Sequence, residues 1–344
     1  MSVQPTAPVR ANRRPAGPAP WLVRIASMRA WLFLVVLLAA FEVWARVSYG
    51  TSFVLSSYNA QSIAVFAVAP LLLALGETFV IIAGGIDLSV GFVMGLSAVI
   101  AAQGTNFASG LLPPFPAMLV GIAAGLLVAL VPGAVNGWLI SKLKVPPFIG
   151  TLGMFGVARG AAFLLANGTT VPVSNAWLAA LGNGRLLGFP IVVIVTGLFV
   201  LLMHYLLGQT RFGQHTYAVG ASEQAALRAG IGVGRLTRKL YLLSALCAGL
   251  GGVLYTARFT AGAAQAGEPL LLDSIAAVVI GGASLFGGSG TILGTVAGAL
   301  VIAVIQYGLV FIDVEPFWQF VAVGVVIIIS VLADQTQRKL GGER

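Results

Sequence analysis

The chain has 344 residues, of which 58% are hydrophobic and only 8% are charged. Soluble domains carry about 25% charged residues, so this composition excludes a soluble globular fold. A formal charge of +9 could suit a nucleic-acid-binding protein, but basic residues also collect in the cytoplasmic loops of membrane proteins. We therefore expect a membrane protein in contact with lipid and without a nucleic-acid partner.

Apolar runs long enough to cross a hydrocarbon core of about 30 Å as helices recur along the whole chain. These runs are apolar on nearly every face, whereas the strands of a transmembrane barrel alternate apolar and polar residues. The sequence therefore predicts an all-α polytopic membrane protein with about ten transmembrane helices. The predicted spans are 30–48, 60–83, 89–104, 116–140, 148–167, 188–208, 238–258, 272–287, 291–311 and 316–333.

Three segments organise the chain around these spans. Residues 1–28 are rich in Pro, Ala and Arg and are predicted to form a disordered basic tail. An uncleaved first span is favoured over a signal peptide, because the charged lead is long and many spans follow. Residues 29–335 form the predicted transmembrane domain, with a cytoplasmic loop at about 208–237, and residues 336–344 form a cytoplasmic tail.

Ten spans place both termini on the same side of the membrane. If that side is the cytoplasm, fifteen Lys and Arg residues lie inside and only Arg46, Arg185 and Arg258 lie outside. Because basic loops resist translocation, this split predicts cytoplasmic termini. Glu268 is then expected on the outer side, and Arg159, within a span, is expected to extend toward a membrane interface.

The stretch 60–104 is nearly continuous apolar sequence, interrupted at Gly84–Gly85. Two helices joined by a tight turn at the double glycine are the favoured interpretation. A single discontinuous helix is the alternative, because unwound backbone is tolerated in a membrane where protein or water covers it.

Glycines recur four residues apart in several predicted spans. This spacing places small residues on one helix face, and it predicts close packing of backbones within one subunit. The sets are Gly91 and Gly95, Gly121 and Gly125, Gly156 and Gly160, and Gly290, Gly294 and Gly298.

A short internal duplication is also indicated. Residues 84–91 (GGIDLSVG) and 281–288 (GGASLFGG) agree at four of eight positions, and an acid, Glu77 or Asp273, precedes each block. Duplicated halves are common in transporters and tend to place the transport pathway at their interface.

Glu77 and Asp87 are the acids deep in the first half of the predicted transmembrane domain. A carboxylate at the middle of a span costs about 2.5–3.5 kcal/mol, so such residues face a bundle interior, a partner or water. For Glu77, solute contact and a structural role are equally supported. For Asp87, capping of the following helix is favoured over solute contact.

The cytoplasmic loop 208–237 contains a predicted short helix. Ser222 is its N-cap, Glu223 lies in the first turn, Ala226 and Leu227 favour helix, and Gly230 ends it. A partly apolar helix on a cytoplasmic loop is suited to docking into a groove of another protein. An inert surface helix is the alternative.

Sequence signals for catalysis are missing. There is no GxxxxGK[ST] loop, no metal motif and no nucleophile–base arrangement, and Cys247 and the two histidines are expected to be structural. We therefore expect no catalytic residue, no metal and no cofactor in this chain. If transport is ATP-driven, ATP and Mg²⁺ bind to a separate ATPase chain.

Five ordered blocks resemble the ribose-type ABC permeases, the family of ribose, arabinose, xylose and related sugar importers. The blocks are GETFVIIAGGIDLSVGFVMGLSAVIAA at 76–102, NGWLISKLKVPPFIGTLGMFGVARG at 136–160, TRFGQHTYAVGASEQAALRAGI at 210–231, LDSIAAVVIGGASLFGGSGTILGT at 272–295 and EPFWQFVAVGVVIIISVLAD at 315–334. The resemblance covers about residues 50–335 and does not specify the sugar.

The resemblance implies a multi-pass subunit of a bacterial inner membrane that translocates a sugar or polyol. It implies two cytoplasmic ABC ATPase subunits, a periplasmic sugar-binding protein, and a second copy or a sister permease. By position, Ser222 to Gly230 would be the ATPase-coupling helix, and Gly84, Gly85, Asp87 and Ser89 would lie in the signature segment. The alternatives are a branched-chain amino acid ABC permease and an ion-coupled secondary transporter.

Overall fold

The computed structural model describes residues 20–315 and 317–340. Within these residues the chain forms thirteen helices and two minimal two-stranded sheets. The helices are α1 Pro20–Tyr49, α2 Ser57–Ile82, α3 Val90–Ser109, α4 Pro114–Lys142, α5 Pro147–Leu165, α6 Ala176–Asn183, α7 Ile191–Gln209, α8 Arg211–Ala221, α9 Glu223–Arg228, α10 Val233–Phe259, α11 Leu270–Ile280, α12 Ile292–Phe311 and α13 Phe317–Leu340. Strand β1 Val171–Pro172 pairs antiparallel with β4 Ala261–Gly262, and β2 Arg185–Leu186 pairs with β3 Phe189–Pro190.

The all-α membrane fold predicted from composition is confirmed. In the described part of the chain, eight helices are long and apolar enough to cross a membrane, and two apolar helices, Leu270–Ile280 and Phe317–Ile329, are shorter. α1 begins at Pro20, inside the segment 1–28 expected to be disordered, and residues 1–19 lie outside the described residues.

Two expectations about span boundaries have opposite outcomes. The predicted turn at Gly84–Gly85 is confirmed, because α2 ends at Ile82 and α3 begins at Val90. The predicted span 272–287 is wrong, because α11 ends at Ile280 before Gly281–Gly282. Eleven residues of helix measure about 16 Å, too short to cross a hydrocarbon core of about 30 Å.

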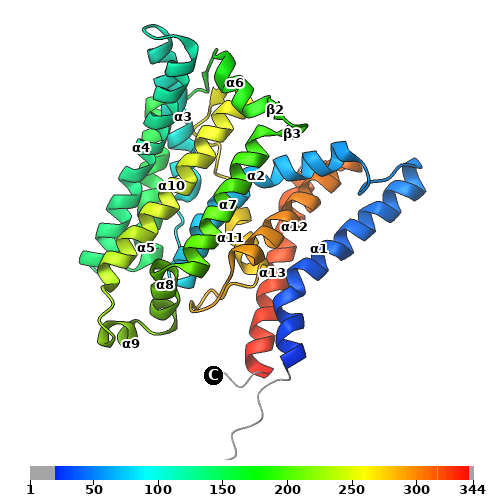
Figure 1. The fold of residues 1–344 in the computed structure, drawn as a ribbon, viewed down its shortest axis with the longest axis vertical. Coiled ribbons are helices and arrows are strands. Elements are labelled where there is room, and N and C mark those ends of the chain that lie inside the picture. The colour runs from blue at the N-terminus through cyan, green and yellow to red at the C-terminus, as the bar shows by residue number, and fades with distance from the viewer. Residues whose placement is uncertain (1–19, 316, 341–344) are drawn as a thin grey trace, which may run out of the picture.

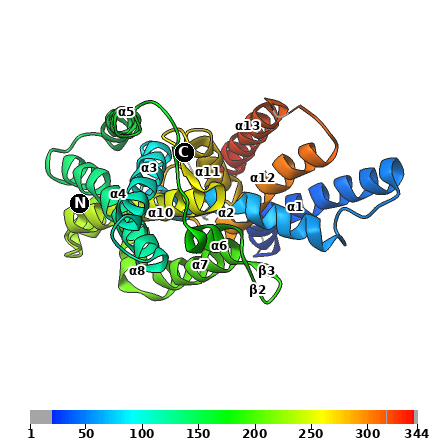
Figure 2. The same cartoon turned by 90° about the horizontal axis from the view of Figure 1, so that it is seen from above.

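The helices form a broad bundle with α5 and α1 at opposite edges (Figures 1 and 2). α3, α4 and α10 pack together, and α2 lies at the centre against α10, α11 and α12. α1 rests on α12, and α5 rests on α3 and α4. The core around α2 is fully buried over residues such as Leu72, Phe79 and Ile82.

Most glycine pairs pack as predicted. A Cβ at Gly121 would overlap Thr105 of α3, and one at Gly298 would overlap the carbonyl oxygen of Ala277 in α11. Gly91 and Gly95 face a non-helical segment, residues 261–269, rather than another helix. Gly156 and Gly160 have nothing within 4 Å of a built Cβ, so the prediction of packing within the subunit is wrong for this pair.

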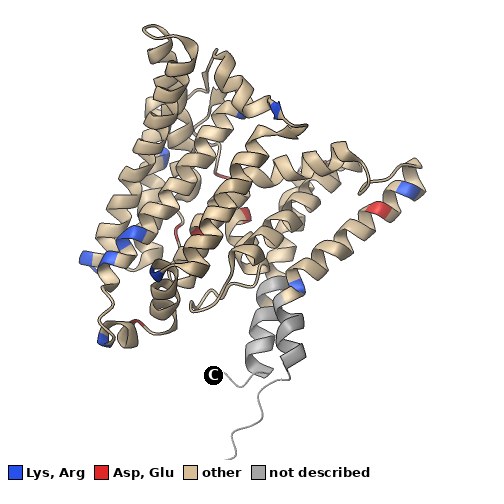
Figure 3. Cartoon of the chain, in the orientation of Figure 1, with Lys and Arg blue, Asp and Glu red and all other residues tan. Residues whose placement is uncertain are grey.

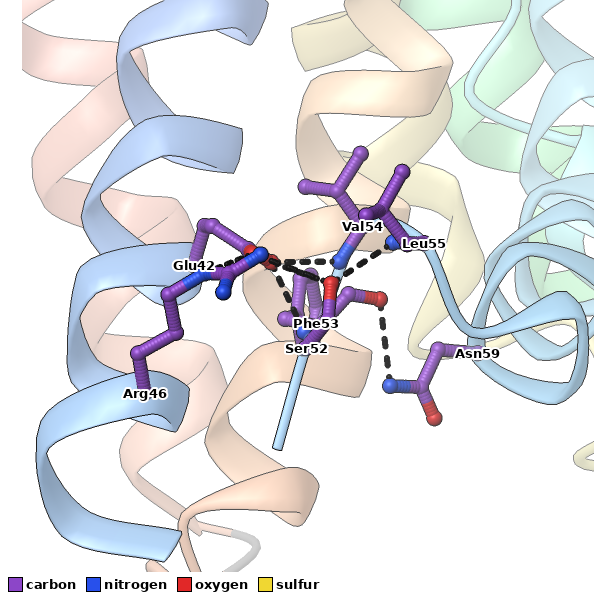
Figure 4. Close-up of polar contacts among 7 residues, drawn as sticks. All are labelled: Glu42, Arg46, Ser52, Phe53, Val54, Leu55 and Asn59. Atoms are coloured by element: carbon purple, nitrogen blue, oxygen red, sulfur yellow. Dashed lines mark hydrogen bonds and ion pairs between the residues drawn. The ribbon is translucent and has the colours of Figure 1, made fainter. Parts of the chain in front are cut away.

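A hydrogen-bonded corner joins α1 to α2 (Figure 4). The Glu42 carboxylate accepts bonds from the Phe53 and Val54 amides, both at 2.8 Å, and from the Ser52 hydroxyl and the Arg46 guanidinium. The carboxylate near the end of α1 therefore holds the turn that leads into α2.

Basic residues gather at one end of the bundle (Figure 3). The blue segments concentrate where the basic ends of α4 and α10 lie beside α8 and α9. We call this the basic end. It includes the termini of α4 at Lys142 and of α10 near Arg235, as the positive-inside pattern predicts.

Candidate functional site

The predicted helix in the cytoplasmic loop exists, with the predicted caps. α9 spans Glu223–Arg228, and the Ser222 hydroxyl accepts a hydrogen bond from the Ala225 amide at 3.2 Å. Gly230 follows with a φ of 80°, a left-handed conformation that glycine adopts without strain. Ala226 is buried against the rest of the protein, whereas Glu223 and Leu227 are exposed. α9 therefore presents one acidic and one apolar side chain at the basic end.

A cavity lies beside α9. It has a volume of about 470 Å³, and its lining combines apolar groups with cationic or titratable ones, including Arg211, His215, Arg235 and Lys239. A second cavity of about 290 Å³ lies between Glu223 and the α2–α3 turn at Gly84 and Gly85. A cavity thus lies at each end of α9, which suits insertion of complementary groups from a partner.

Three separate segments meet immediately before α9, at the end of α8. A Cβ at Gly220 would overlap the carbonyl oxygen of Ile82 at the end of α2 and would lie 2.6 Å from the Gly288 amide nitrogen. The Gly288 amide itself donates to the Ile82 carbonyl at 2.8 Å. A Cβ at Gly287 would lie 3.1 Å from the Gly84 nitrogen. We call Gly84, Gly220, Gly287 and Gly288 the glycine junction.

The junction joins α8 to both glycine-rich turns of the chain. The Tyr217 hydroxyl, one helical turn before Gly220, donates to the Gly290 carbonyl at 2.7 Å. Burial raises the pKa of Tyr217 above its ordinary value of 10.0, so the hydroxyl stays a donor at neutral pH. The contacts of the glycine junction are backbone-to-backbone contacts, with no flexible side chain between the segments.

The signature segment Gly84–Ser89 holds a buried polar cluster. Asp87 accepts hydrogen bonds from the Ser89 amide at 3.1 Å, from the Ser89 hydroxyl at 2.6 Å and from the Ser244 hydroxyl of α10 at 2.9 Å. The Ser89 hydroxyl also accepts from the Asn136 amide of α4 at 3.0 Å. The cluster therefore fixes the α2–α3 turn to α4 and α10.

Neither acid of this cluster faces an opening. Glu77 and Asp87 have exposed fractions of 0% and 1%, and the Asp87 amide donates to Glu77 at 3.4 Å. The expectation that Asp87 caps the following helix is wrong, because Asp87 binds the turn before α3 and the N-cap of α3 is Ser89. The bonds give Asp87 a structural role, whereas one carboxylate oxygen of Glu77 is buried without a hydrogen-bond partner among the described residues. Contact with solute stays a prediction for both acids.

The residues of this site that sequence reasoning missed are Gly220, Ser244 and Asn136. Ser244 and Asn136 are 157 and 47 residues from their partners in the first turn. An isolated serine or asparagine in an apolar span was the one available signal, since polar groups inside a membrane need partners.

Comparison with known proteins places these features in a family. Residues 59–331 match the family described as "Branched-chain amino acid transport system / permease component". The ribose import permease of Bacillus subtilis is 41% identical over 266 residues, covering 77% of this chain and 80% of that protein. The fructose import permease of Rhizobium meliloti is 39% identical over 272 residues, covering 77% and 74%.

The D-allose transport permease of Escherichia coli K12 is 33% identical over 288 residues, 84% of this chain and 86% of that protein. The family match, over residues 59–331, includes the α2–α3 turn, α8, α9 and the α11–α12 turn. The chain therefore belongs to this permease family, among the ribose-type ABC permeases.

Proposed function

We propose that this chain is the membrane-spanning permease subunit of an ATP-driven importer for a sugar or related polyol in a bacterial inner membrane. The observation that carries the proposal is the extended similarity to permeases named for ribose, fructose and D-allose. Three different sugars among relatives of 33–41% identity mean that the sugar itself is not fixed by this likeness. The same relatives favour a sugar over a branched-chain amino acid and an ABC permease over an ion-coupled carrier.

The partners follow from the permease role. A periplasmic binding protein would deliver the solute, and a second copy or a sister permease would complete the pore. ATP and Mg²⁺ would bind to separate cytoplasmic ATPase subunits, which fits the absence of a phosphate-binding loop from the sequence.

We assign ATPase docking to α9. It lies at the basic end, it exposes Glu223 and Leu227, and cavities flank it. Closure of the ATPases on ATP would push α9, and the glycine junction would carry the movement to the ends of α2 and α11. The bundle would then alternate between two openings, with nucleotide and loaded binding protein favouring different states.

The double substitution Glu223→Arg with Leu227→Asp tests the docking surface. We expect the variant to insert into the membrane normally and to lose co-purification with the ATPase, because a charge is reversed and an apolar contact becomes a buried acid. Arg185→Glu with Leu187→Asp is the matched control, since these residues are exposed on the hairpin at the other end of the bundle. Undiminished co-purification of the α9 variant would refute docking at α9.

A further inference from the structure

An ion pair between α5 and the segment 261–269 is partly exposed at the surface of the described part of the chain. The Arg159 guanidinium of α5 is 4.0 Å from the Glu268 carboxylate, and the two side chains are 51% and 43% exposed. The guanidinium also lies 5.2 Å from the centre of the Phe92 ring in the first turn of α3. Both charges are therefore partly open, beside a buried aromatic ring.

The Arg159 side chain runs back along α5 from a position in the C-terminal half of this helix. Arg159 is about 18 Å along α5 from Pro147 and about 9 Å from Leu165, at 1.5 Å per residue. Its guanidinium lies over the Phe92 ring, which packs on Phe155, so the side chain is directed away from the Leu165 end of α5. The direction of the side chain is thus known relative to the helix, and its extension toward a membrane interface stays a prediction.

Glu268 is also deeper than predicted. Its neighbour Gly267 packs on Gly91, where a Cβ would lie 2.7 Å from the Gly267 carbonyl oxygen, and Ala264 packs on Gly95. Gly91 lies in the first turn of α3, one helix length from the outer loop that follows Ser109. The segment 261–269 therefore descends along α3 into the bundle, and the expected outer position of Glu268 is wrong.

Lipid is an unsuitable cover for the two charges. A charged side chain is costly to place in the hydrocarbon of a membrane, and here two are about half-exposed. Gly156 and Gly160, on the adjoining surface of α5, have nothing within 4 Å of a built Cβ. Gly156, Arg159 and Gly160 are thus exposed positions of one helix, and Glu268 lies beside them.

We propose that the α5 face carrying Gly156, Arg159 and Gly160, together with Glu268, borders the water-filled passage for the imported solute. Arg159 and Glu268 would exchange hydrogen bonds with the hydroxyl groups of a neutral sugar or polyol. A guanidinium offers five donors and a carboxylate only acceptors, so the pair matches hydroxyls that both donate and accept. At 4.0 Å the two groups are beyond hydrogen-bond distance, so each keeps bonding capacity for a passing solute. This inference rests on the proposed function.

Cysteine accessibility tests the passage directly. The chain has a single cysteine, Cys247, which is fully buried and gives a low background. Gly156→Cys and Gly160→Cys would be compared with Leu198→Cys, which replaces an exposed apolar residue in the middle of α7. The assembled transporter in membrane vesicles would be treated with a charged, membrane-impermeant thiol reagent.

We expect both α5 cysteines to react about tenfold or more faster than Leu198→Cys, because the reactive thiolate forms in water and not in lipid. Saturating transported sugar should slow the α5 reactions and leave Leu198→Cys unchanged. Equal, slow labelling at all three positions would overturn the proposal, since it would mean that lipid or a dry contact covers α5.

Uptake measurements separate this inference from the proposed function. Glu268→Gln should lower the rate of sugar uptake about tenfold, the effect of losing a charge-assisted hydrogen bond, while ATPase co-purification stays normal. Normal uptake by Glu268→Gln would remove the pair from the solute's path and leave the permease role intact. A wild-type protein that imports no sugar with its partners would instead refute the permease role.

Discussion

The two glycine-rich turns of the chain stop their helices in the same way but differ in the chemistry they carry. After α2, Gly84 adopts a φ of 84° and the Gly85 amide donates to the Val80 carbonyl at 2.9 Å. After α11, Gly282 adopts a φ of 91° and the Ala283 amide donates to the Val278 carbonyl at 3.1 Å. Both are C-terminal caps that require a left-handed glycine.

Asp87 and Ser284 make equivalent hydrogen bonds in the two turns. Asp87 accepts a bond from the amide two residues on, Ser89, and Ser284 accepts one from Phe286, again two residues on, at 3.1 Å. The short sequence match aligns Asp87 with Ser284, in agreement with these bonds. The left-handed glycines are offset by one residue from that alignment, because Gly84 is three residues before Asp87 and Gly282 is two before Ser284.

The acids ahead of the turns are not equivalent, although the sequence suggested a match. Glu77 precedes its left-handed glycine by seven residues and Asp273 precedes its own by nine. Two residues rotate a helical side chain by about 200°, to the other face. Glu77 accordingly lies beside Asp87, whereas Asp273 accepts a bond from Gln306 of α12 at 2.8 Å. Only the first turn contains a buried acidic cluster. Both turns, however, contact α8.

Substituting Gly220 tests that shared contact and should have the largest effect. Gly220→Ala places a methyl group against the Ile82 carbonyl and near the Gly288 amide, which should cost about 1–3 kcal/mol and push both turns from α8. We expect sugar uptake to fall strongly while ATPase binding at α9 persists. Gly208→Ala on α7 is the matched control, because nothing lies within 4 Å of its Cβ. Equal uptake by the two variants would mean that the junction transmits nothing.

The contacts of the glycine junction could not be predicted from the sequence. Hydropathy located the long helices, and Ser222 and Gly230 correctly bounded α9, because local residues decide spans and caps. Gly220 stands in a polar loop, and its partners lie more than sixty residues away in two different turns. The end of α11 was missed because the apolar run continues through Gly281 and Gly282, and the direction of Arg159 depends on Phe92, which only the folded bundle brings near.

Truncating Asp87 should destabilise the protein more than truncating Ser284, because only Asp87 belongs to a buried acidic cluster. Asp87→Ala leaves the Ser89 and Ser244 hydroxyls without their acceptor in the bundle interior, which should cost about 1–3 kcal/mol of stability. Ser284→Ala removes its bond to the Phe286 amide and should cost about 0.5–1.5 kcal/mol. Thermal unfolding of the purified proteins in detergent would rank the two variants.

Asp87→Asn is the matched control for charge. It keeps an acceptor for Ser89 in nearly the same shape, so it should be less destabilising than Asp87→Ala. If Ser284→Ala proved as damaging as Asp87→Ala, the acidic cluster would add nothing to the turn, and the contrast between the two turns would fail.

The substitution Tyr217→Phe should have the smallest effect, because it weakens the contact of α8 with the second turn and leaves the contact with the first turn intact. The substitution removes the bond to the Gly290 carbonyl and leaves the ring in place, so we expect a loss of about 1 kcal/mol. Because burial raises the pKa of Tyr217 above 10.0, the protonated donor is present in the folded protein throughout pH 6–9, and deprotonation would weaken stability only at higher pH. The stability difference from wild type should therefore stay constant across pH 6–9. Tyr205→Phe is the control for loss of a hydroxyl, because Tyr205 is an exposed residue of α7. If the stability difference between Tyr217→Phe and wild type changed with pH between 6 and 9, another titrating group would hold the turn.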